Sequence, residues 1–307
     1  MNKLCKAYNL SLDSNHSQMN NQDLRLEISN IENLPKLPSL RMAVVGHVEW
    51  VTFVGLDNLP QPGTVGHANW TKEEPAGAGA VIAVTMSKLL STPVDFFTAL
   101  GKDEIGEKSN QRLKQLGVKT HVAWVDQPTR RGISFVDQHG DRAITVIGDR
   151  LEPKSTDKLP WEIFSNINGV FVTATDSKGL ENCRKASVLL ATPRLTVAVI
   201  EKSKIQLDCL IGSAYDQNEK VDTNQLSKKP KLVIKTEADE GCRVMPDKRY
   251  KAVRLSEPVI DTYGCGDTFA AAFSLALTAE WDIHQAISYA AHYGAHCALI
   301  KGPYDVG

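Results

Sequence analysis

The chain has 307 residues, a length that fits one large α/β domain with an appendage or two modest domains. Its 35 basic and 36 acidic residues leave a formal net charge of −1, which argues against nucleic acid or an anionic membrane as a partner. Six cysteines without a Cys-x-x-Cys pair indicate reduced thiols and a cytoplasmic location, and no run of about 20 apolar residues predicts a membrane span.

Residues 1–39 are polar and lack periodicity, so they are expected to form a mobile tail before a single domain over residues 40–307. Apolar runs bounded by glycine and proline predict the elements of that domain. Strands are expected at 42–46, 47–54, 95–100, 118–125, 132–137, 142–147, 170–173, 197–200, 209–211 and 232–236. Helices are expected to end near residue 90 and to cover 106–116, 180–190, 267–279 and 283–299. This alternation predicts an α/β fold with a mostly parallel sheet between two helical layers.

The most informative segment is Asp261-Thr-Tyr-Gly-Cys-Gly-Asp-Thr-Phe269, which precedes a run of small apolar residues. Glycines let the backbone turn tightly, and a helix beginning near Asp267 adds its positive N-terminal end to the same point. The combination favours an anion held by the backbone N–H groups of the turn, those of Gly264, Cys265 and Gly266. A carboxylate would repel an anion bound beside it, so a chemical role is expected for Asp267. It is suited to take the proton of a hydroxyl that attacks a phosphoryl group.

This segment resembles the second signature of the PfkB, or ribokinase-like, family of carbohydrate and nucleoside kinases. The resemblance extends over most of the chain from Arg41 to Tyr304 and implies a three-layer ribokinase-like sandwich. It also implies a small β-sheet lid from about 51–72 and 119–140, which in many members makes a homodimer contact. The implied activity is ATP-dependent, Mg²⁺-assisted phosphorylation of an alcohol group on a sugar, polyol or nucleoside, with K⁺ as an activating ion in several relatives.

The same resemblance assigns residues to the phosphate donor and to cations. The segment from Thr236 to Gly241 is similar to the strand and turn that lie along ATP in the family. It makes Thr236, Ala238 and Gly241 the expected nucleotide contacts, although Ala238 stands where relatives carry glycine. Asp216 is expected to organise Mg²⁺ through water, and Asp261 matches a position that binds a monovalent cation in several relatives.

The acceptor end of the family pattern is altered in this chain. Relatives begin with Gly-Ser-x-Asn-x-Asp, whereas this sequence has Gly46-His47-Val-Glu49. His47 and Glu49 share one face of an extended strand, so both are expected to bind substrate hydroxyls. Gly77 and Gly79 match the family's glycine turn beside the substrate, but the asparagine of that element is missing.

Two further features leave alternatives open. Asp103, in a Gly-x-Asp-x-x-Gly element, suits either a helix N-cap or a substrate contact. Arg130 and Arg131 enter an expected lid strand and could meet a charged substrate group, although exposed loop arginines are commoner.

The sequence therefore predicts a PfkB-type kinase with Asp267 as its general base. The alternative is a catalytically weak or inactive member of the same fold that binds nucleotide or sugar in a regulatory role. Ala238, Ser213 and the rewritten acceptor motif keep that alternative open, and the intact turn before Asp267 favours the kinase.

Overall fold

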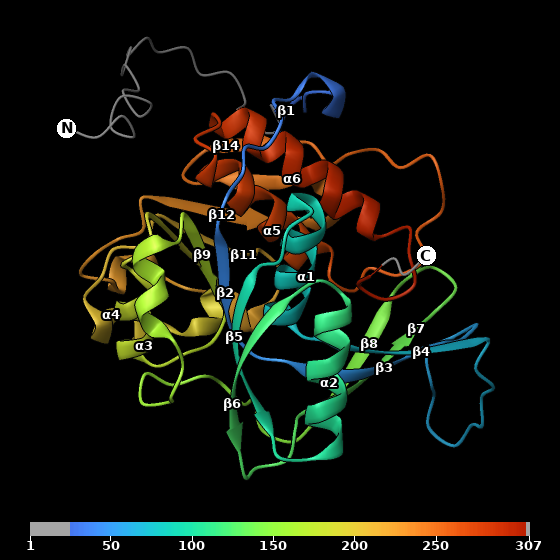
Figure 1. Ribbon diagram of the computed structural model, residues 1–307. Coiled ribbons are helices and arrows are strands. Elements are labelled where there is room, and N and C mark those ends of the chain that lie inside the picture. The colour runs from blue at the N-terminus through green and yellow to red at the C-terminus, as the bar shows by residue number, and fades with distance from the viewer. Residues whose placement is uncertain (1–24, 305–307) are drawn as a thin grey trace.

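The computed structural model describes residues 25–304, whose centre is a ten-stranded sheet with a four-stranded sheet beside it (Figure 1). The strands of the large sheet are β1 (Arg25–Leu26), β2 (Met42–Val45), β5 (Asp95–Gly101), β6 (Lys119–Val125), β9 (Gly169–Val172), β10 (Val188–Ala191), β11 (Cys209–Ser213), β12 (Leu232–Thr236), β13 (Cys242–Val244) and β14 (Lys248–Tyr250). Their order is β1-β14-β13-β12-β11-β10-β9-β2-β5-β6. All pairs from β12 to β6 are parallel, whereas β13 is antiparallel to both of its neighbours.

Helices cover both faces of the large sheet, in two layers that Figure 1 shows on opposite sides. One layer shares an apolar core with the sheet and consists of α1 (Ala78–Leu90), α5 (Cys265–Thr278) and α6 (Ile283–Cys297). The other layer packs in a second core and consists of α3 (Ser177–Cys183) and α4 (Val197–Ser203). α2 (Glu104–Gln115) packs beside β5 and β6. The predicted α/β sandwich is confirmed.

The central strands have the sequence character that burial on two faces requires. β2 and β9 read Met-Ala-Val-Val and Gly-Val-Phe-Val, and every one of these residues is buried. α5 carries small residues where it lies against neighbouring helices and strands, so that its backbone can approach closely. No helix among residues 25–304 is long and apolar enough to cross a membrane.

The small sheet has the order β4-β3-β7-β8 and lies to one side of the large sheet in Figure 1. Its strands are β3 (Glu49–Gly55), β4 (Trp70–Ala76), β7 (Arg131–Val136) and β8 (Arg142–Ile147). The expected lid range of 119–140 was wrong at its start, because β6 pairs in parallel with β5 and extends the large sheet. The lid strands are instead supplied by residues 49–55, 70–76, 131–136 and 142–147.

The expected tail over residues 1–39 is also corrected in part. β1 pairs in parallel with β14 and therefore adds a strand to the edge of the large sheet. Ser29 then binds α6, where its N–H donates to Ser288 Oγ (3.0 Å) and its carbonyl oxygen lies 3.0 Å from His292 Nε2. Polar composition alone did not reveal these contacts. Residues 1–24 lie outside the described part of the chain.

Two predicted elements in the α3–α4 region were wrong. The apolar run at 197–200 is helical, not extended, because the Thr196 hydroxyl caps α4 by accepting a hydrogen bond from the Val199 N–H. The helix expected over 180–190 ends at Cys183, and residues 188–191 form β10, which pairs with β9. In both cases long-range pairing or a cap outweighed the local apolar pattern.

Candidate active site

The turn before α5 has the geometry that its glycines predicted. Gly264 lies at φ +81°, and a Cβ atom there would come within 3.1 Å of Pro303 and 3.3 Å of Val81. Gly264 and Thr268 close the first turn of the helix through a 2.8 Å backbone hydrogen bond. The Cys265 N–H makes only a long 3.4 Å bond to the Thr262 carbonyl, and the space where a Gly266 side chain would lie is open. The turn thus presents backbone donors at an accessible helix N-terminus.

Asp267 lies half-buried in the first turn of α5. Desolvation and the negative charge of Glu219 raise the pKa of its carboxyl group from an ordinary value of 3.8 to about 7. Arg194 and Arg142 act in the opposite direction, and the charge of Glu49 adds to the rise. A carboxyl group with a pKa near neutrality can exchange a proton during turnover, which is the property a general base needs.

Glu219 and Arg194 are functional candidates that sequence reasoning missed. Arg194 Nε donates to Glu219 Oε1 (2.6 Å), and the Ser213 N–H donates to Glu219 Oε2 (2.6 Å). Arg194 also pairs with Asp216. Both missed residues lie on connections that leave the carboxyl ends of the adjacent parallel strands β10 and β11, where ligands of such sheets usually bind. Their position after the carboxyl ends of two strands was the sequence feature that could have identified them.

Asp216, which was expected to organise Mg²⁺, is already engaged in contacts within the protein. It caps a short 3-10 turn by accepting from the Asn218 N–H (2.8 Å), and it pairs with Arg194. The charge that acts most strongly on Asp267 is that of Glu219. Residues 25–304 contain no cluster of three or more His, Cys, Asp or Glu side chains that could hold a metal ion alone. Oxygen ligands from Asp216 and Glu219 still fit a hydrated Mg²⁺ that is held mainly by phosphates.

His47 and Glu49 form a buried polar cluster at the start of the lid. His47 Nε2 lies 3.6 Å from Glu49 Oε1, and Arg130 Nε lies 3.3 Å from the same oxygen. Burial lowers the pKa of His47 and opposes ionisation of Glu49. The close imidazole of His47 and the positive charges of Arg130 and Arg194 nevertheless hold the pKa of Glu49 below its usual value. Glu49 is therefore a carboxylate that can accept hydrogen bonds from hydroxyl groups.

Gly77 and Gly79 allow the start of α1 to approach this cluster. Gly77 lies at φ +84°, and its N–H donates to the Tyr263 hydroxyl (3.2 Å). A side chain at Gly79 would place Cβ 2.7 Å from the His47 carbonyl oxygen, a distance that Cβ atoms do not tolerate. The glycines thus bring the acceptor cluster and the segment before α5 together.

Asp103 serves as a helix cap and loop brace. Its Oδ1 accepts from the Gly106 N–H (2.7 Å) and the Thr129 hydroxyl (2.8 Å), and its Oδ2 accepts from the Thr129 N–H (2.7 Å). Because these hydrogen bonds occupy both oxygens, the structure favours the capping alternative over the substrate contact.

The loop expected to contact nucleotide follows β12. Thr236 ends this strand and pairs with Ser213 on one side and Cys242 on the other. Ala238 adopts a left-handed conformation at φ +50°, which explains why glycine suits this position. Gly241 lies at φ +104°, and a Cβ atom there would meet the Tyr250 carbonyl oxygen at 2.1 Å. The loop keeps the expected tight turn despite the alanine.

Asp261 is fully buried and accepts two backbone hydrogen bonds, from Tyr263 N–H (2.8 Å) and Gly302 N–H (3.0 Å). Desolvation raises the pKa of its carboxyl group despite these bonds. Asp261 therefore ties the turn before α5 to the C-terminal segment. Its assignment to a monovalent cation stays a prediction.

The chain is similar to known proteins over most of its length. The model of the pfkB family of carbohydrate kinases matches residues 39–192 and 204–305. A ribokinase of Arabidopsis thaliana is 23% identical over 291 residues, which cover 85% of this chain and 76% of the relative. An ATP-dependent ribose-1-phosphate kinase of Halopiger xanaduensis is 20% identical, with coverage of 86% and 93%.

Solved structures show the same fold at low sequence identity. A ribokinase of Thermotoga maritima superposes with a TM-score of 0.68 at 22% identity and covers 86% of this chain and 94% of that one. An adenosine kinase of Sinorhizobium meliloti has a TM-score of 0.69 at 15% identity, with coverage of 88% and 97%. The Arabidopsis ribokinase complexed with ribose and ATP has a TM-score of 0.64 at 19% identity and covers 86% and 94%.

Proposed function

The chain belongs to the pfkB family of carbohydrate kinases, and we propose that it transfers the terminal phosphoryl group of ATP to a hydroxyl of a sugar, polyol or nucleoside. The observation that carries the proposal is Asp267, whose pKa is raised to about 7 at the open N-terminus of α5. Relatives named ribokinase, ribose-1-phosphate kinase and nucleoside kinase support an acceptor of this class.

In the proposed reaction Asp267 accepts the proton of the acceptor hydroxyl while that oxygen attacks the terminal phosphorus of ATP. The new bond joins the acceptor oxygen to phosphorus, and the bond from phosphorus to the bridging oxygen of ADP breaks. Backbone N–H groups of Gly264, Cys265 and Gly266 stabilise the charge on the transferred group. Arg142 and Arg194, whose charges act on Asp267, add positive potential at the same place.

His47 and Glu49 orient the acceptor by hydrogen bonding to its hydroxyl groups, and Arg130 holds Glu49 in its ionised form. The glycines at 77 and 79 keep the start of α1 close to His47 and Glu49, because no side chain intervenes. This part of the proposal supports a small polyhydroxy acceptor without naming one.

The nucleotide is proposed to lie along the loop that contains Thr236, Ala238 and Gly241. Mg²⁺ would neutralise part of the phosphate charge, and Glu219 and Asp216 would accept hydrogen bonds from its water ligands. β8 exposes apolar side chains at the free edge of the lid sheet, and these would suit the predicted homodimer contact. They are Ile144, Val146 and Ile147.

The proposal is tested by measuring ADP formation from Mg²⁺-ATP with a panel of sugars, polyols and nucleosides, with and without K⁺. At least one acceptor is expected to raise ADP formation by about 100-fold or more over the acceptor-free rate, because an oriented hydroxyl replaces water as the nucleophile. If every acceptor leaves the rate at its background value, the regulatory alternative is favoured over the kinase.

Glu219→Gln is expected to lower the pKa of Asp267 by removing the negative charge that most raises it after desolvation. The rate is expected to rise with pH until the base is deprotonated, near pH 7 in the wild type. In the variant this limb should lie at lower pH, which a pH profile of kcat/KM will reveal. Glu201→Gln, in α4, is the matched control and should leave the limb unchanged, because Glu201 is not among the charges that act on Asp267. An unmoved limb in Glu219→Gln would contradict the assigned coupling.

A further inference from the structure

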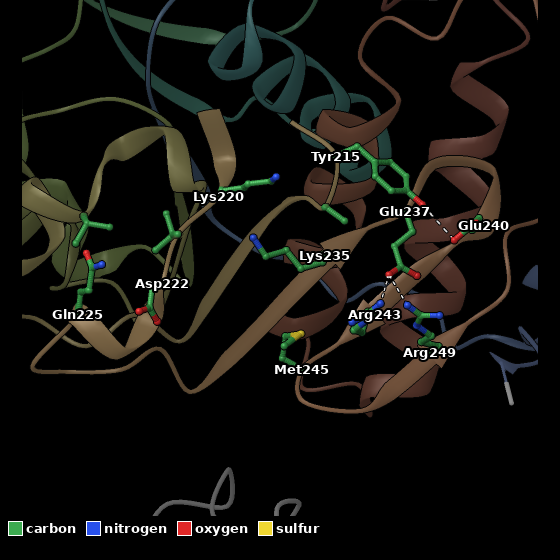
Figure 2. A pocket seen from close by; sticks show the side chains of 13 residues that line it. Tyr215, Lys220, Asp222, Gln225, Lys235, Glu237, Glu240, Arg243, Met245 and Arg249 are labelled. Carbon is green, nitrogen blue, oxygen red and sulfur yellow. Dashed lines mark hydrogen bonds and ion pairs between the residues drawn. The ribbon is translucent and has the colours of Figure 1, made fainter. Parts of the chain in front are cut away.

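A groove of about 780 Å³ lies on the face of the large sheet formed by β12, β13 and β14, beyond α4 (Figure 2). Val197 of α4 and the β11–β12 connection border it. That connection contains two short 3-10 turns, Gln217–Glu219 and Thr223–Gln225, in place of a long helix. The volume lies in the range of pockets that hold small molecules.

Basic side chains stand in direct cross-strand register on the floor of this groove. Lys235 of β12 pairs with Arg243 of β13, and Arg243 pairs with Arg249 of β14. Arg249 is in turn opposite Arg25 of β1. Four neighbouring strands thus place four cations in one row, which we name the basic row. Like charges directly opposite one another are unfavourable on a sheet, so the row requires compensating negative charge.

The protein supplies part of that negative charge through Glu237. This buried carboxylate accepts from Arg243 Nη2 (2.8 Å) and Arg249 Nη2 (3.4 Å), and its other oxygen lies 3.3 Å from Arg25 Nη1. Glu240 adds a second ion pair with Arg25 at 2.8 Å. Figure 2 shows both arginines of β13 and β14 directed at Glu237. Within residues 25–304, these two carboxylates pair with the three arginines of the basic row, and neither pairs with Lys235.

Two hydrogen-bond donors of the basic row, on Lys235 and Arg243, have unsatisfied bonding capacity within residues 25–304. The Lys235 ammonium donates to the Glu219 carbonyl oxygen (3.2 Å) and has no carboxylate within ion-pair distance in the described chain. Desolvation lowers the pKa of this lysine, with the charge of Glu219 acting in the opposite direction. The buried Nε–H of Arg243 has no hydrogen-bond acceptor among residues 25–304. Both groups would gain from an anion in the groove.

The walls of the groove also carry apolar and aromatic side chains, which binding of an inorganic anion would not require. Tyr215 and Met245 line the groove and are more than two-fifths exposed, at 57% and 43%. Val197 and Val221 provide apolar surface, and Lys220 adds a further cation from the β11–β12 connection. Asp222 also lines the groove, but it is exposed and caps the second 3-10 turn.

We propose that this groove binds a small phosphorylated compound whose phosphate groups lie on the basic row and whose apolar part lies against Tyr215 and Met245. The site is separate from the acceptor cluster at Glu49, and the proposal does not depend on the kinase activity. Lys235 donates a hydrogen bond to the carbonyl oxygen of Glu219, and the charge of Glu219 raises the pKa of Asp267. The groove is therefore linked to the proposed catalytic residue through Glu219.

Tripolyphosphate is the probe for the anion part of the site. Its binding is followed by thermal unfolding and by calorimetric titration, in the presence of saturating Mg²⁺-ATP to occupy the proposed nucleotide loop. The wild type is expected to gain about 2–4 °C in Tm at a probe concentration near ten times Kd. Lys235→Gln/Arg243→Gln is expected to weaken binding by about 10-fold or more. The absence of a shift in the wild type would overturn the proposal.

Two further variants keep this test decisive. Lys248→Gln removes a charge from β14 at a position paired with Val244, off the basic row, and should retain wild-type affinity. Lys220→Glu changes an exposed residue that lies outside the strands of the sheet, and it should weaken tripolyphosphate binding even if the double variant folds poorly. Wild-type affinity in Lys220→Glu, or in a folded double variant, would overturn the proposal. A compound bound by the wild type but not by Lys220→Glu supports it.

Discussion

Asp267→Asn is expected to lower kcat by about 100-fold or more, because the variant loses the group proposed to accept the hydroxyl proton. The same change is expected to increase stability at alkaline pH. Folding raises the pKa of this carboxyl from 3.8 to about 7, so the folded state binds more protons than the unfolded state between these values. Wild-type stability therefore falls as pH rises through this window, whereas asparagine does not titrate.

The variant should accordingly match the wild type near pH 4 and exceed its free energy of unfolding by about 1–3 kcal/mol at pH 8. Steady-state kinetics and urea unfolding at the two pH values measure the two effects separately. Asp247→Asn, in the exposed turn between β13 and β14, is the control and should change neither. Near-normal turnover of Asp267→Asn would remove this residue from the chemistry. A loss of stability would instead show that its carboxylate is structural.

Glu49→Gln is expected to raise KM for the acceptor by about 10- to 100-fold, with a smaller change in kcat. The amide keeps the shape of the side chain but loses the charge that strengthens its hydrogen bonds to hydroxyl groups, worth about 1.5–3 kcal/mol. Arg130 Nε also lies 3.3 Å from Glu49 Oε1, so the variant leaves this half-buried cation without its carboxylate. The measurement is a full kinetic analysis with the best acceptor of the panel.

Glu73→Gln is the matched control, because Glu73 lies on the neighbouring lid strand and forms an exposed ion pair with Lys108 (3.2 Å). It should leave KM within about 2-fold of the wild type. An unchanged KM in Glu49→Gln would exclude this residue from acceptor binding. A fall in kcat with an unchanged KM would instead indicate that the charge of Glu49 affects catalysis by changing the pKa of Asp267.

The parts of the site that the sequence predicted are those determined locally. The turn at Gly264 follows from a glycine that must adopt positive φ before a helix, and every residue involved is adjacent in the chain. The helices of one layer, α1, α5 and α6, followed from apolar periodicity, and buried strands such as β2 and β9 followed from continuous apolar runs. These features require no knowledge of how distant segments meet.

The parts that were missed depend on distant segments. Arg194 and Glu219 meet because two connections fold against each other after adjacent strands, which no local pattern encodes. The basic row depends on the pairing register of four strands, one of which, β1, lies in the expected tail. The valines at 197 and 199 favour extended structure locally, yet they lie in α4, whose first turn is capped by Thr196.

The path of β3 has a consequence for how this protein can change over evolution. Glu49 is the first residue of the strand that continues as the middle of the lid, and it follows β2 of the large sheet after only three residues. If the lid moves about this short connection, the Glu49 carboxylate, which is proposed to bind the acceptor, moves with it. Selectivity and closure are therefore not independent traits. A substitution at position 49 is thus expected to affect acceptor binding and lid movement together.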